Sequence, residues 1–209
     1  MEVLQQTFKT IFAMLLLLIL LRFSLGFAVY DIETIAGNGV ALTTGSDGNI
    51  GSAGLNNPVA VWENSAGTVY IVEKNSHCVR QYSTTDSIIH DFAGVCAFFG
   101  SSGDGGKATS SLLNGPSGVG GNLQGVVFIA DKSNNRVRAV AADGIISTFA
   151  GDGGVVFGGD GGQASSSPIN SPFGLWVNSL GIVYVVQNSG ARVRSIDSSG
   201  IIFTLAGML

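Results

Sequence analysis

Charged and catalytic side chains are scarce in this chain. Only 11% of its 209 residues are Asp, Glu, Lys or Arg, and it contains two histidines, two cysteines and four prolines. The formal net charge of −4 at pH 7 argues against nucleic acid as a partner, because proteins that bind it neutralise phosphates with a basic surface. No Asn-x-Ser/Thr sequon occurs, so the sequence carries no signal for N-glycosylation.

Glycine, in contrast, is abundant: its 31 residues are about twice the usual share. Short runs rich in Val, Ile, Tyr and Phe lie between glycine-containing turns, a pattern typical of β-strands. No long stretch shows the helical period of about 3.6 residues. The sequence therefore predicts an all-β protein.

An internal repeat predicts the architecture. The same strand ending recurs at intervals of 57, 57 and 56 residues, measured between alanines (93−36, 150−93 and 206−150). Its copies are Ala36-Gly37, Ala93-Gly94, Ala150-Gly151 and Ala206-Gly207. A fixed period of this length is typical of a solenoid, a propeller or another repeat array.

Each repeat predicts four antiparallel strands. A proline-led apolar strand comes first, a strand rich in β-branched and aromatic residues follows, a strand around a valine flanked by arginines is third, and the last strand ends in Ala-Gly. The predicted blades cover residues 57–94, 115–151 and 171–207, and a lone outer strand covers residues 30–36.

The repeats resemble a known family. The stretches at residues 70–79, 128–137 and 184–193 are similar to the NHL repeat, named for Asn-His-Leu near the start of its third strand. The first copy departs from the pattern with Cys78 in place of arginine, and the third with Gly190-Ala191 in place of two asparagines. The resemblance implies β-propeller blades, usually six in a closed ring, that serve chiefly as interaction surfaces.

Three blades and one strand amount to a half propeller. Each blade buries its faces against its neighbours, so an open arc exposes apolar surface and strand edges at both ends. Three outcomes remain open at this point: a truncated gene product, an arc that pairs with a second copy to close a ring, or an arc that docks on another protein.

Residues 1–28 form a predicted targeting segment ahead of the repeats at 29–209. A basic residue precedes an apolar run over residues 11–21, and Ala28 is a small residue suited to cleavage. This run of about 11 residues matches a secretory signal and is shorter than the roughly 18 that span a bilayer. The alternative is an uncleaved single-pass anchor in which Arg22 snorkels to a membrane edge. In both cases the repeats would be secreted, lumenal or otherwise outside the cytosol.

Two cysteines in such a compartment could pair. Cys78 lies on the third strand of the first repeat, and Cys96 lies a few residues beyond the position opposite it. Bridging needs α-carbons within about 7 Å, so both the paired and the free state stay open. A zinc site made by these cysteines with His77 and His90 is disfavoured, because adjacent strand residues point to opposite faces.

Arginine recurs at fixed positions of the third strand. The second repeat has Arg136 and Arg138, and the third has Arg192 and Arg194. Asp131 ends the strand before Arg136, so we expect an ion pair across this hairpin, worth about 0–1 kcal/mol if it is exposed. We interpret these five residues as structural.

A glycine-rich turn precedes each repeat. The copy at Gly103-Asp104-Gly105 fails as a phosphate loop, because Ala108 stands where such a loop requires a hydroxyl. A turn that needs positive φ is the simpler interpretation. The aspartates of the three turns, Asp47, Asp104 and Asp160, are weak candidates for calcium ligands, and no other cofactor is indicated.

The sequence as a whole predicts a non-catalytic module for protein interaction. No nucleophile–base motif appears. The peptide-amidating lyases related to this family hold a metal with histidines in the central channel, but here both histidines lie in one repeat and cannot line a channel from several blades. The alternatives are a structural or adhesion segment of a membrane-anchored protein and a fragment of a propeller lyase. The expected partner is another protein or a second copy of the chain, and the membrane is contacted only through the N-terminal segment.

Overall fold

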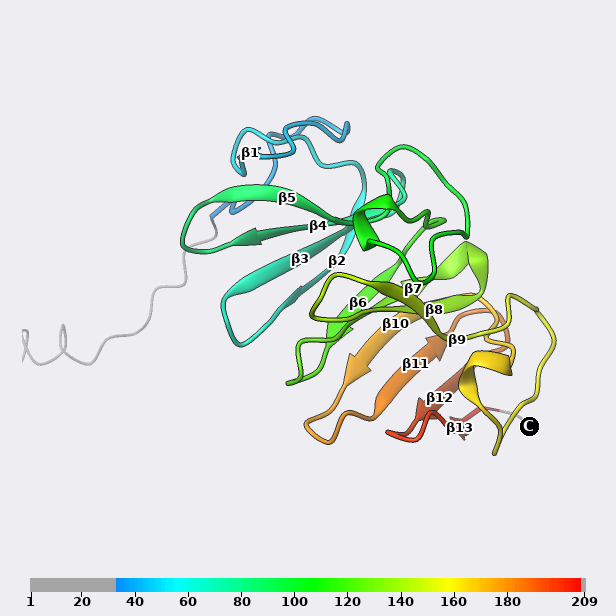
Figure 1. Ribbon diagram of the computed structural model, residues 1–209. Coiled ribbons are helices and arrows are strands. Elements are labelled where there is room, and N and C mark those ends of the chain that lie inside the picture. Colours follow the sequence, from blue (N-terminus) through cyan, green and yellow to red (C-terminus); the bar gives the residue numbers. More distant parts are fainter. Residues whose placement is uncertain (1–32, 208–209) are drawn as a thin grey trace, which may run out of the picture. The chain divides into compact units, whose positions relative to one another are not determined.

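The computed structural model describes residues 33–207 as β-sheets joined by loops and three short 3-10 helices (Figure 1). The predicted targeting segment at residues 1–28 lies outside the described residues. None of the helices within residues 33–207 is long and apolar enough to cross a membrane.

Three antiparallel sheets of four consecutive strands follow one another along the chain. Blade 1 contains β2 (Pro58–Glu63), β3 (Thr68–Glu73), β4 (Cys78–Ser83) and β5 (Ile88–Ala93). Blade 2 contains β6 (Gly118–Gly121), β7 (Val127–Asp131), β8 (Arg136–Val140) and β9 (Ile146–Ala150). Blade 3 contains β10 (Pro172–Val177), β11 (Val183–Gln187), β12 (Arg192–Ile196) and β13 (Ile202–Ala206). Radially repeated four-stranded sheets of this kind are the blades of a β-propeller.

A thirteenth strand is present, but its position differs from the sequence prediction. Residues 33–36, the described part of the expected lone strand at 30–36, form no strand. The extra strand is instead β1 (Gly48–Asn49), which pairs with β5 at the edge of blade 1. Residues 33–36 belong to none of the described sheets, and a strand without a partner is unstable.

Long connections lead into each blade, and they are called leading loops here: residues 37–57, 94–117 and 151–171. The second contains η1 (Ala108–Ser110) and the third η3 (Ala164–Ser166), whereas η2 (Lys132–Asn134) lies in the β7–β8 turn. In the second loop the Ala108 carbonyl accepts from Gly94, at the end of blade 1, and its amide donates to the Gly144 carbonyl of blade 2. Ala164 makes the equivalent bonds with Gly151 and Gly200 in the third loop. The second and third leading loops thus each join two adjacent blades, which explains their length of more than 20 residues.

The Ala-Gly ending that identified the repeat has a steric cause. Ala93 and Ala150 are completely buried, and Gly151 has a φ of +93°, which L side chains rarely adopt. A β-carbon at Gly151 would lie 2.3 Å from the carbonyl oxygen of Asn135. The ending is therefore needed wherever an outer strand turns into the next leading loop.

The hydrophobic core lies between blades. We call the side of a blade that faces the preceding blade its leading face, and the opposite side its trailing face. The trailing face of blade 1 packs on the leading face of blade 2 through Val72, Val119 and Val127. The trailing face of blade 2 packs in the same way on Val183 and Val185 of blade 3.

Candidate functional site

One buried arginine occupies the same position in every blade. Arg80, Arg138 and Arg194 lie on the third strands β4, β8 and β12 and are at most 1% exposed. A guanidinium group that leaves water in this way must gain acceptors and negative charge inside the protein. These three arginines and their partners are called the arginine anchors.

The anchor of blade 2 contains two carboxylates. Arg138 Nη1 lies 3.5 Å from Asp131 Oδ2, and Nη2 lies 2.5 Å from Asp104 Oδ1. Asp131 also accepts from the Asn114 amide and from Asn134 Nδ2, both at 2.7 Å. The anchor therefore connects β7 and β8 to the leading loop, from which Asp104 and Asn114 come.

The predicted ion pair between Asp131 and Arg136 is wrong. These residues are register partners, but the carboxylate is buried and turns to Arg138, whereas Arg136 stays near solvent and donates to the Asp152 carbonyl at 3.3 Å. Arg192, its counterpart in blade 3, lies 4.4 Å above the ring centre of Phe157. Both outer arginines thus contact the leading loop at residues 151–171, which follows blade 2 and precedes blade 3, and the inner arginines bind carboxylates.

Blade 3 keeps one carboxylate instead of two. Arg194 Nη2 binds Asp160 Oδ1 at 2.7 Å and the Gly158 carbonyl at 3.0 Å. Gln187 stands where blade 2 has Asp131, and its buried Oε1 makes no hydrogen bond. The third anchor therefore has fewer carboxylates around its arginine than the other two.

The anchor of blade 1 was not predicted from the sequence. Arg80 Nη1 lies 3.4 Å from Glu73 Oε1, both side chains being fully buried, and Nε lies 3.5 Å from Asp91 Oδ1. Arg80 also donates to the carbonyls of Thr44 and Gly54 in the leading loop, at 3.2 Å each. The sequence does contain a signal for this anchor. Each third strand has two positions at which arginine occurs, and only the inner one holds arginine in all three repeats.

In blade 1 a hydroxyl and a carboxylate exchange positions. In blade 2 the loop supplies Asp104 and β9 supplies Thr148, whose hydroxyl donates to it at 2.7 Å. In blade 1 the loop supplies Ser46 and β5 supplies Asp91, and the hydroxyl again donates to the carboxylate, at 2.8 Å. The same hydrogen bond forms between loop and strand with its two partners reversed.

The anchor carboxylates differ in their titration. Burial raises the pKa of Asp104, but hydrogen bonds from Thr148 and Arg138 and the charge of Arg138 outweigh it, so this pKa lies below its usual value. The pKa of Asp160 is lowered in the same way, against the effect of burial, by Thr204 and Arg194. For Asp131 burial prevails over Asn134, Asn114 and Arg138, and its pKa is raised.

The calcium candidates have protein partners. Asp104 and Asp160 bind the anchor arginines. Asp47 is the counterpart of Gly105 rather than of Asp104, because its amide donates to the Ile89 carbonyl as the Gly105 amide donates to the Ile146 carbonyl. The carboxylate of Asp47 lies 2.5 Å from Nδ1 of His90. Within residues 33–207 no three His, Cys, Asp or Glu side chains gather as a metal site would require.

Cys78 and Cys96 form a disulfide with α-carbons 5.1 Å apart. Ala97, with a φ of +71°, turns the chain back and donates to the Ser76 carbonyl at 2.8 Å, which brings Cys96 close to β4. His77 lies in the turn before β4 rather than on the strand, and its Nδ1 accepts from the Gly115 amide at 2.9 Å. Burial lowers the pKa of this histidine.

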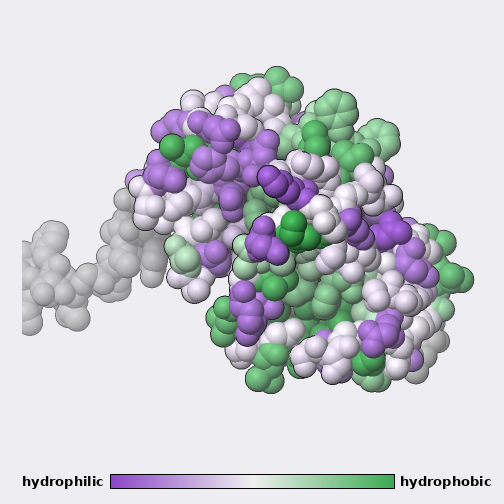
Figure 2. All heavy atoms as spheres, in the orientation of Figure 1, coloured by the Kyte–Doolittle hydropathy of each residue, from purple (hydrophilic) through white to green (hydrophobic). Residues whose placement is uncertain are grey.

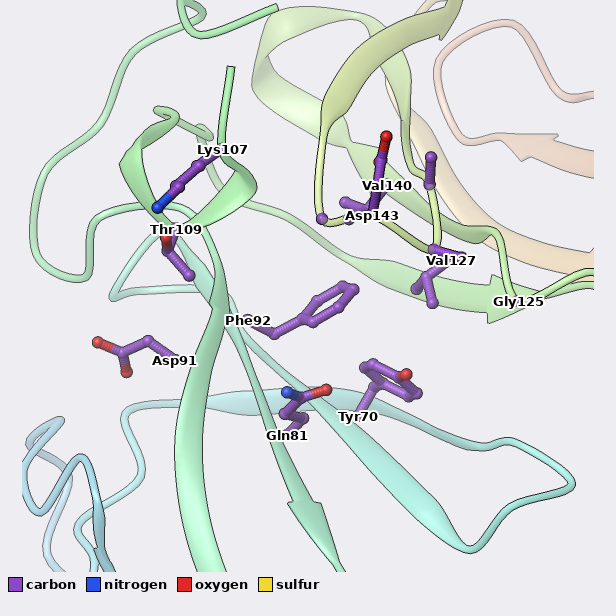
Figure 3. A pocket seen from close by; sticks show the side chains of 13 residues that line it. Tyr70, Gln81, Asp91, Phe92, Lys107, Thr109, Gly125, Val127, Val140 and Asp143 are labelled. Carbon is purple, nitrogen blue, oxygen red and sulfur yellow. The ribbon is translucent and has the colours of Figure 1, made fainter. Parts of the chain in front are cut away.

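A cleft of about 440 Å³ opens between blades 1 and 2 (Figure 3). Phe92, Tyr70 and Gln81 line it on the side of blade 1 and Val127 on the side of blade 2, whereas Asp91 points away from Phe92. Burial raises the pKa of Tyr70, although a hydrogen bond from Asn64 lowers it in part. The lining also includes the charged residues Asp91, Lys107 and Asp143 but no histidine or cysteine.

Each leading loop also exposes large apolar side chains shortly after its Ala-Gly. All of these residues are more than half exposed, and together they are called the apolar loop tips: Val40, Leu42, Phe98, Phe99, Val155, Val156 and Phe157. Figure 2 shows apolar atoms along the upper and right-hand edge, where the leading loops of Figure 1 lie.

The blades and their anchors define a partial β-propeller. No family model matches the chain. Teneurin-4 from Homo sapiens and from Mus musculus is 31% identical to it over 98 residues, which are 41% of the chain and 4% of the relative. The chain thus spans a small fraction of the curated relatives that it matches.

Solved structures show the same fold. An auxiliary nutrient binding protein from Bacteroides ovatus superposes with a TM-score of 0.55 at 20% identity, over 74% of this chain and 39% of that one. A putative phosphatase from Bacteroides thetaiotaomicron gives 0.54 at 22% identity, over 66% and 34%. At these identities the likeness concerns the fold alone.

Proposed function

We propose that this chain is an NHL-type β-propeller module that acts outside the cytosol and binds another protein without catalysing a reaction. The observation that carries the proposal is the recurrence of the apolar loop tips at the same position of three leading loops. Exposed apolar side chains gathered on loops of a rigid scaffold are typical of interaction sites.

The tips of the second and third leading loops are held in place without a partner. Arg194 binds the Gly158 carbonyl next to Phe157, and Arg192 lies over the ring of that phenylalanine. In the second loop the disulfide at Cys96 lies two residues from Phe98. A pre-ordered loop loses less conformational entropy on binding, so more of its contact energy contributes to affinity.

Sequence features support the type of propeller and its compartment. The third strands of the repeats resemble the NHL pattern, as in Arg136-Val137-Arg138. The disulfide between Cys78 and Cys96 suits an oxidising environment, which agrees with the predicted targeting segment at residues 1–28. N-terminal sequencing of the purified chain distinguishes the secreted form, with a start near Val29, from the anchored alternative, with a start at Met1.

Substitution of the loop tips tests the proposed binding role. Phe98→Ser with Phe99→Ser removes two exposed aromatic side chains and is expected to weaken binding of the labelled chain to cell surfaces at least about tenfold, as loss of hot-spot residues does. Leu123→Ser with Leu180→Ser is the matched control, because these leucines are even more exposed but lie in the turns after β6 and β10. Equal binding by both variants would contradict the role of the loop tips.

The non-catalytic part of the proposal has its own test. The purified chain is assayed for bound zinc and for turnover of a peptidylglycine intermediate, the substrate of the lyases that share the NHL resemblance. We expect neither, because the two histidines occur in one repeat and are engaged with Gly115 and Asp47. Stoichiometric zinc together with turnover would replace the binding role by the lyase alternative.

A further inference from the structure

The trailing face of blade 3 is apolar and uncovered within the described residues. Trp176 of β10 is 62% exposed, and Val186 of β11 and Leu205 of β13 are 45% and 56% exposed. Tyr184 lies beside Trp176, with ring centres 5.4 Å apart. Large apolar groups on one side of a sheet mark a surface suited to a partner.

The same face of blade 1 shows what such a surface binds. Trp62 and Tyr70 form an equivalent ring pair with centres 5.3 Å apart, and they pack with Val72 in the core shared with blade 2. Val72, the counterpart of Val186, is completely buried. The ring pair of blade 3 is thus already arranged as in the covered blade, and the missing element is the leading face of another blade.

The leading face of blade 1 packs Val69 and Ile71 against its own leading loop, but the part of this face that β2 forms is uncovered within the described residues. Val61 of β2 is 67% exposed, whereas its counterpart Val119 in blade 2 is 6% exposed because blade 1 covers it. One end of the described chain therefore presents a trailing face and the other a leading face. Surfaces of this kind meet head to tail, which is a heterologous contact.

We propose that the trailing face of blade 3 binds the leading face of blade 1 in a second copy of this chain. This contact repeats the two contacts between blades that the fold already contains. It does not depend on which protein the loop tips bind, because Trp176 and Val61 lie on blade faces rather than on the leading loops.

One residue makes the contact between copies weaker than the contacts inside the chain. Under Trp62 lies Gly121, where a β-carbon would come within 2.3 Å of the indole ring. The residue of blade 1 at the position of Gly121 is Glu63, the last residue of β2. A glutamate facing Trp176 must fold aside, so Glu63→Gly should create the space that Gly121 provides and strengthen the association.

Sedimentation velocity of the full chain between about 1 and about 100 µM, the range of modest protein affinities, tests the proposal. We expect association that depends on concentration and that Leu205→Glu, on the trailing face, or Val61→Glu, on the leading face, abolishes. Glu63→Gly should lower the midpoint concentration about tenfold. Leu180→Glu, an exposed leucine outside both faces, should leave the midpoint unchanged, as should Phe98→Ser with Phe99→Ser.

Mixing the two face variants identifies the geometry. The Val61→Glu chain keeps its trailing face and the Leu205→Glu chain its leading face, so an equimolar mixture should form dimers that neither variant forms alone. Contact between two trailing faces would instead leave Val61→Glu fully associated, and that result overturns the proposal. A monomer at every concentration, or a mixture without dimers, overturns it as well.

Discussion

Blades 1 and 2 hold their leading loops at the same places with different chemistry. In blade 2 the loop carboxylate of Asp104 meets the strand hydroxyl of Thr148, whereas in blade 1 the loop hydroxyl of Ser46 meets the strand carboxylate of Asp91. Both carboxylates lie against the buried inner arginine. The two blades thus share the hydroxyl–carboxylate hydrogen bond between loop and strand, but the carboxylate comes from the loop in blade 2 and from the strand in blade 1.

The contact between the third strand and the start of the next leading loop also differs in chemistry between blades 1 and 2. Arg136 of blade 2 donates to the Asp152 carbonyl at the start of the next leading loop. In blade 1 the equivalent strand position is Cys78, and its disulfide with Cys96 joins the strand to the start of the next loop. Both blades thus link their third strand to the following loop, blade 2 through a hydrogen bond and blade 1 through a covalent bond.

The largest expected effect concerns the inner arginine. Arg138→Met leaves Asp131 buried without its cation and should lower the free energy of unfolding by about 3–5 kcal/mol. Arg136→Met is the matched control, two residues away on β8 but near solvent, and should cost less than about 1 kcal/mol. Urea unfolding followed by circular dichroism measures both, and equal losses would contradict the distinction between inner and outer arginines.

The disulfide should rank second. Cys78→Ser with Cys96→Ser opens a loop of 18 residues and is expected to lower the free energy of unfolding by about 3 kcal/mol. The loss should exceed that of Arg136→Met, because the covalent link restricts the unfolded chain and the hydrogen bond does not. The same urea titration provides the measurement, and a loss no larger than that of Arg136→Met would show that the two links are equivalent.

In blade 3 a substitution should increase the free energy of unfolding. Gln187→Glu supplies the carboxylate that blade 3 lacks, at the position where Asp131 binds Arg138 in blade 2, and removes the hydrogen bond that Gln187 Nε2 donates to the Asn170 carbonyl. It should raise the free energy of unfolding by about 1 kcal/mol, the net value of a hydrogen bond between partners of this kind. Gln187→Met is the control of similar size, and a gain with methionine as large as with glutamate would assign the effect to packing.

The smallest effect is a dependence on pH. The pKa of Asp104 is lowered in the folded chain, so its contribution to stability is present above about pH 4 and is lost as the pH falls through its folded pKa. The pKa of Asp131 is raised, so its contribution has the opposite sign and diminishes as the pH rises through the folded pKa. Unfolding between about pH 2 and 6 should show a shallower loss in acid for Asp104→Asn and a steeper one for Asp131→Asn, and a parallel change in both would contradict these directions.

The sequence predicts the blades well because the repeat supplies its own controls. Strand order follows from three copies of one pattern, and the Ala-Gly ending follows from a backbone requirement that only glycine meets. The lone strand at residues 30–36 was expected by analogy with the other endings, but its described part, residues 33–36, pairs with no strand.

The anchors could be predicted only in part. A strand pattern shows which residues share a face, but it does not show that a guanidinium is buried, so Asp131 was paired with Arg136 instead of Arg138. The exchange between Ser46 and Asp91 involves residues 45 positions apart, and it becomes visible only when loop and strand are seen together. The disulfide depended on the turn at Ala97, which no general rule assigns to alanine.

The most direct test of the account is a double-mutant cycle on the exchanged pair of blade 1. Ser46→Asp alone places two carboxylates together, and Asp91→Thr alone removes the charge from Arg80, so each should lower the free energy of unfolding by about 1–3 kcal/mol. The double variant recreates the arrangement of blade 2 and should recover most of this loss, with a coupling energy above about 1 kcal/mol. Losses that simply add, within about 0.5 kcal/mol, would contradict the claim that the blades share one anchor with interchangeable sides.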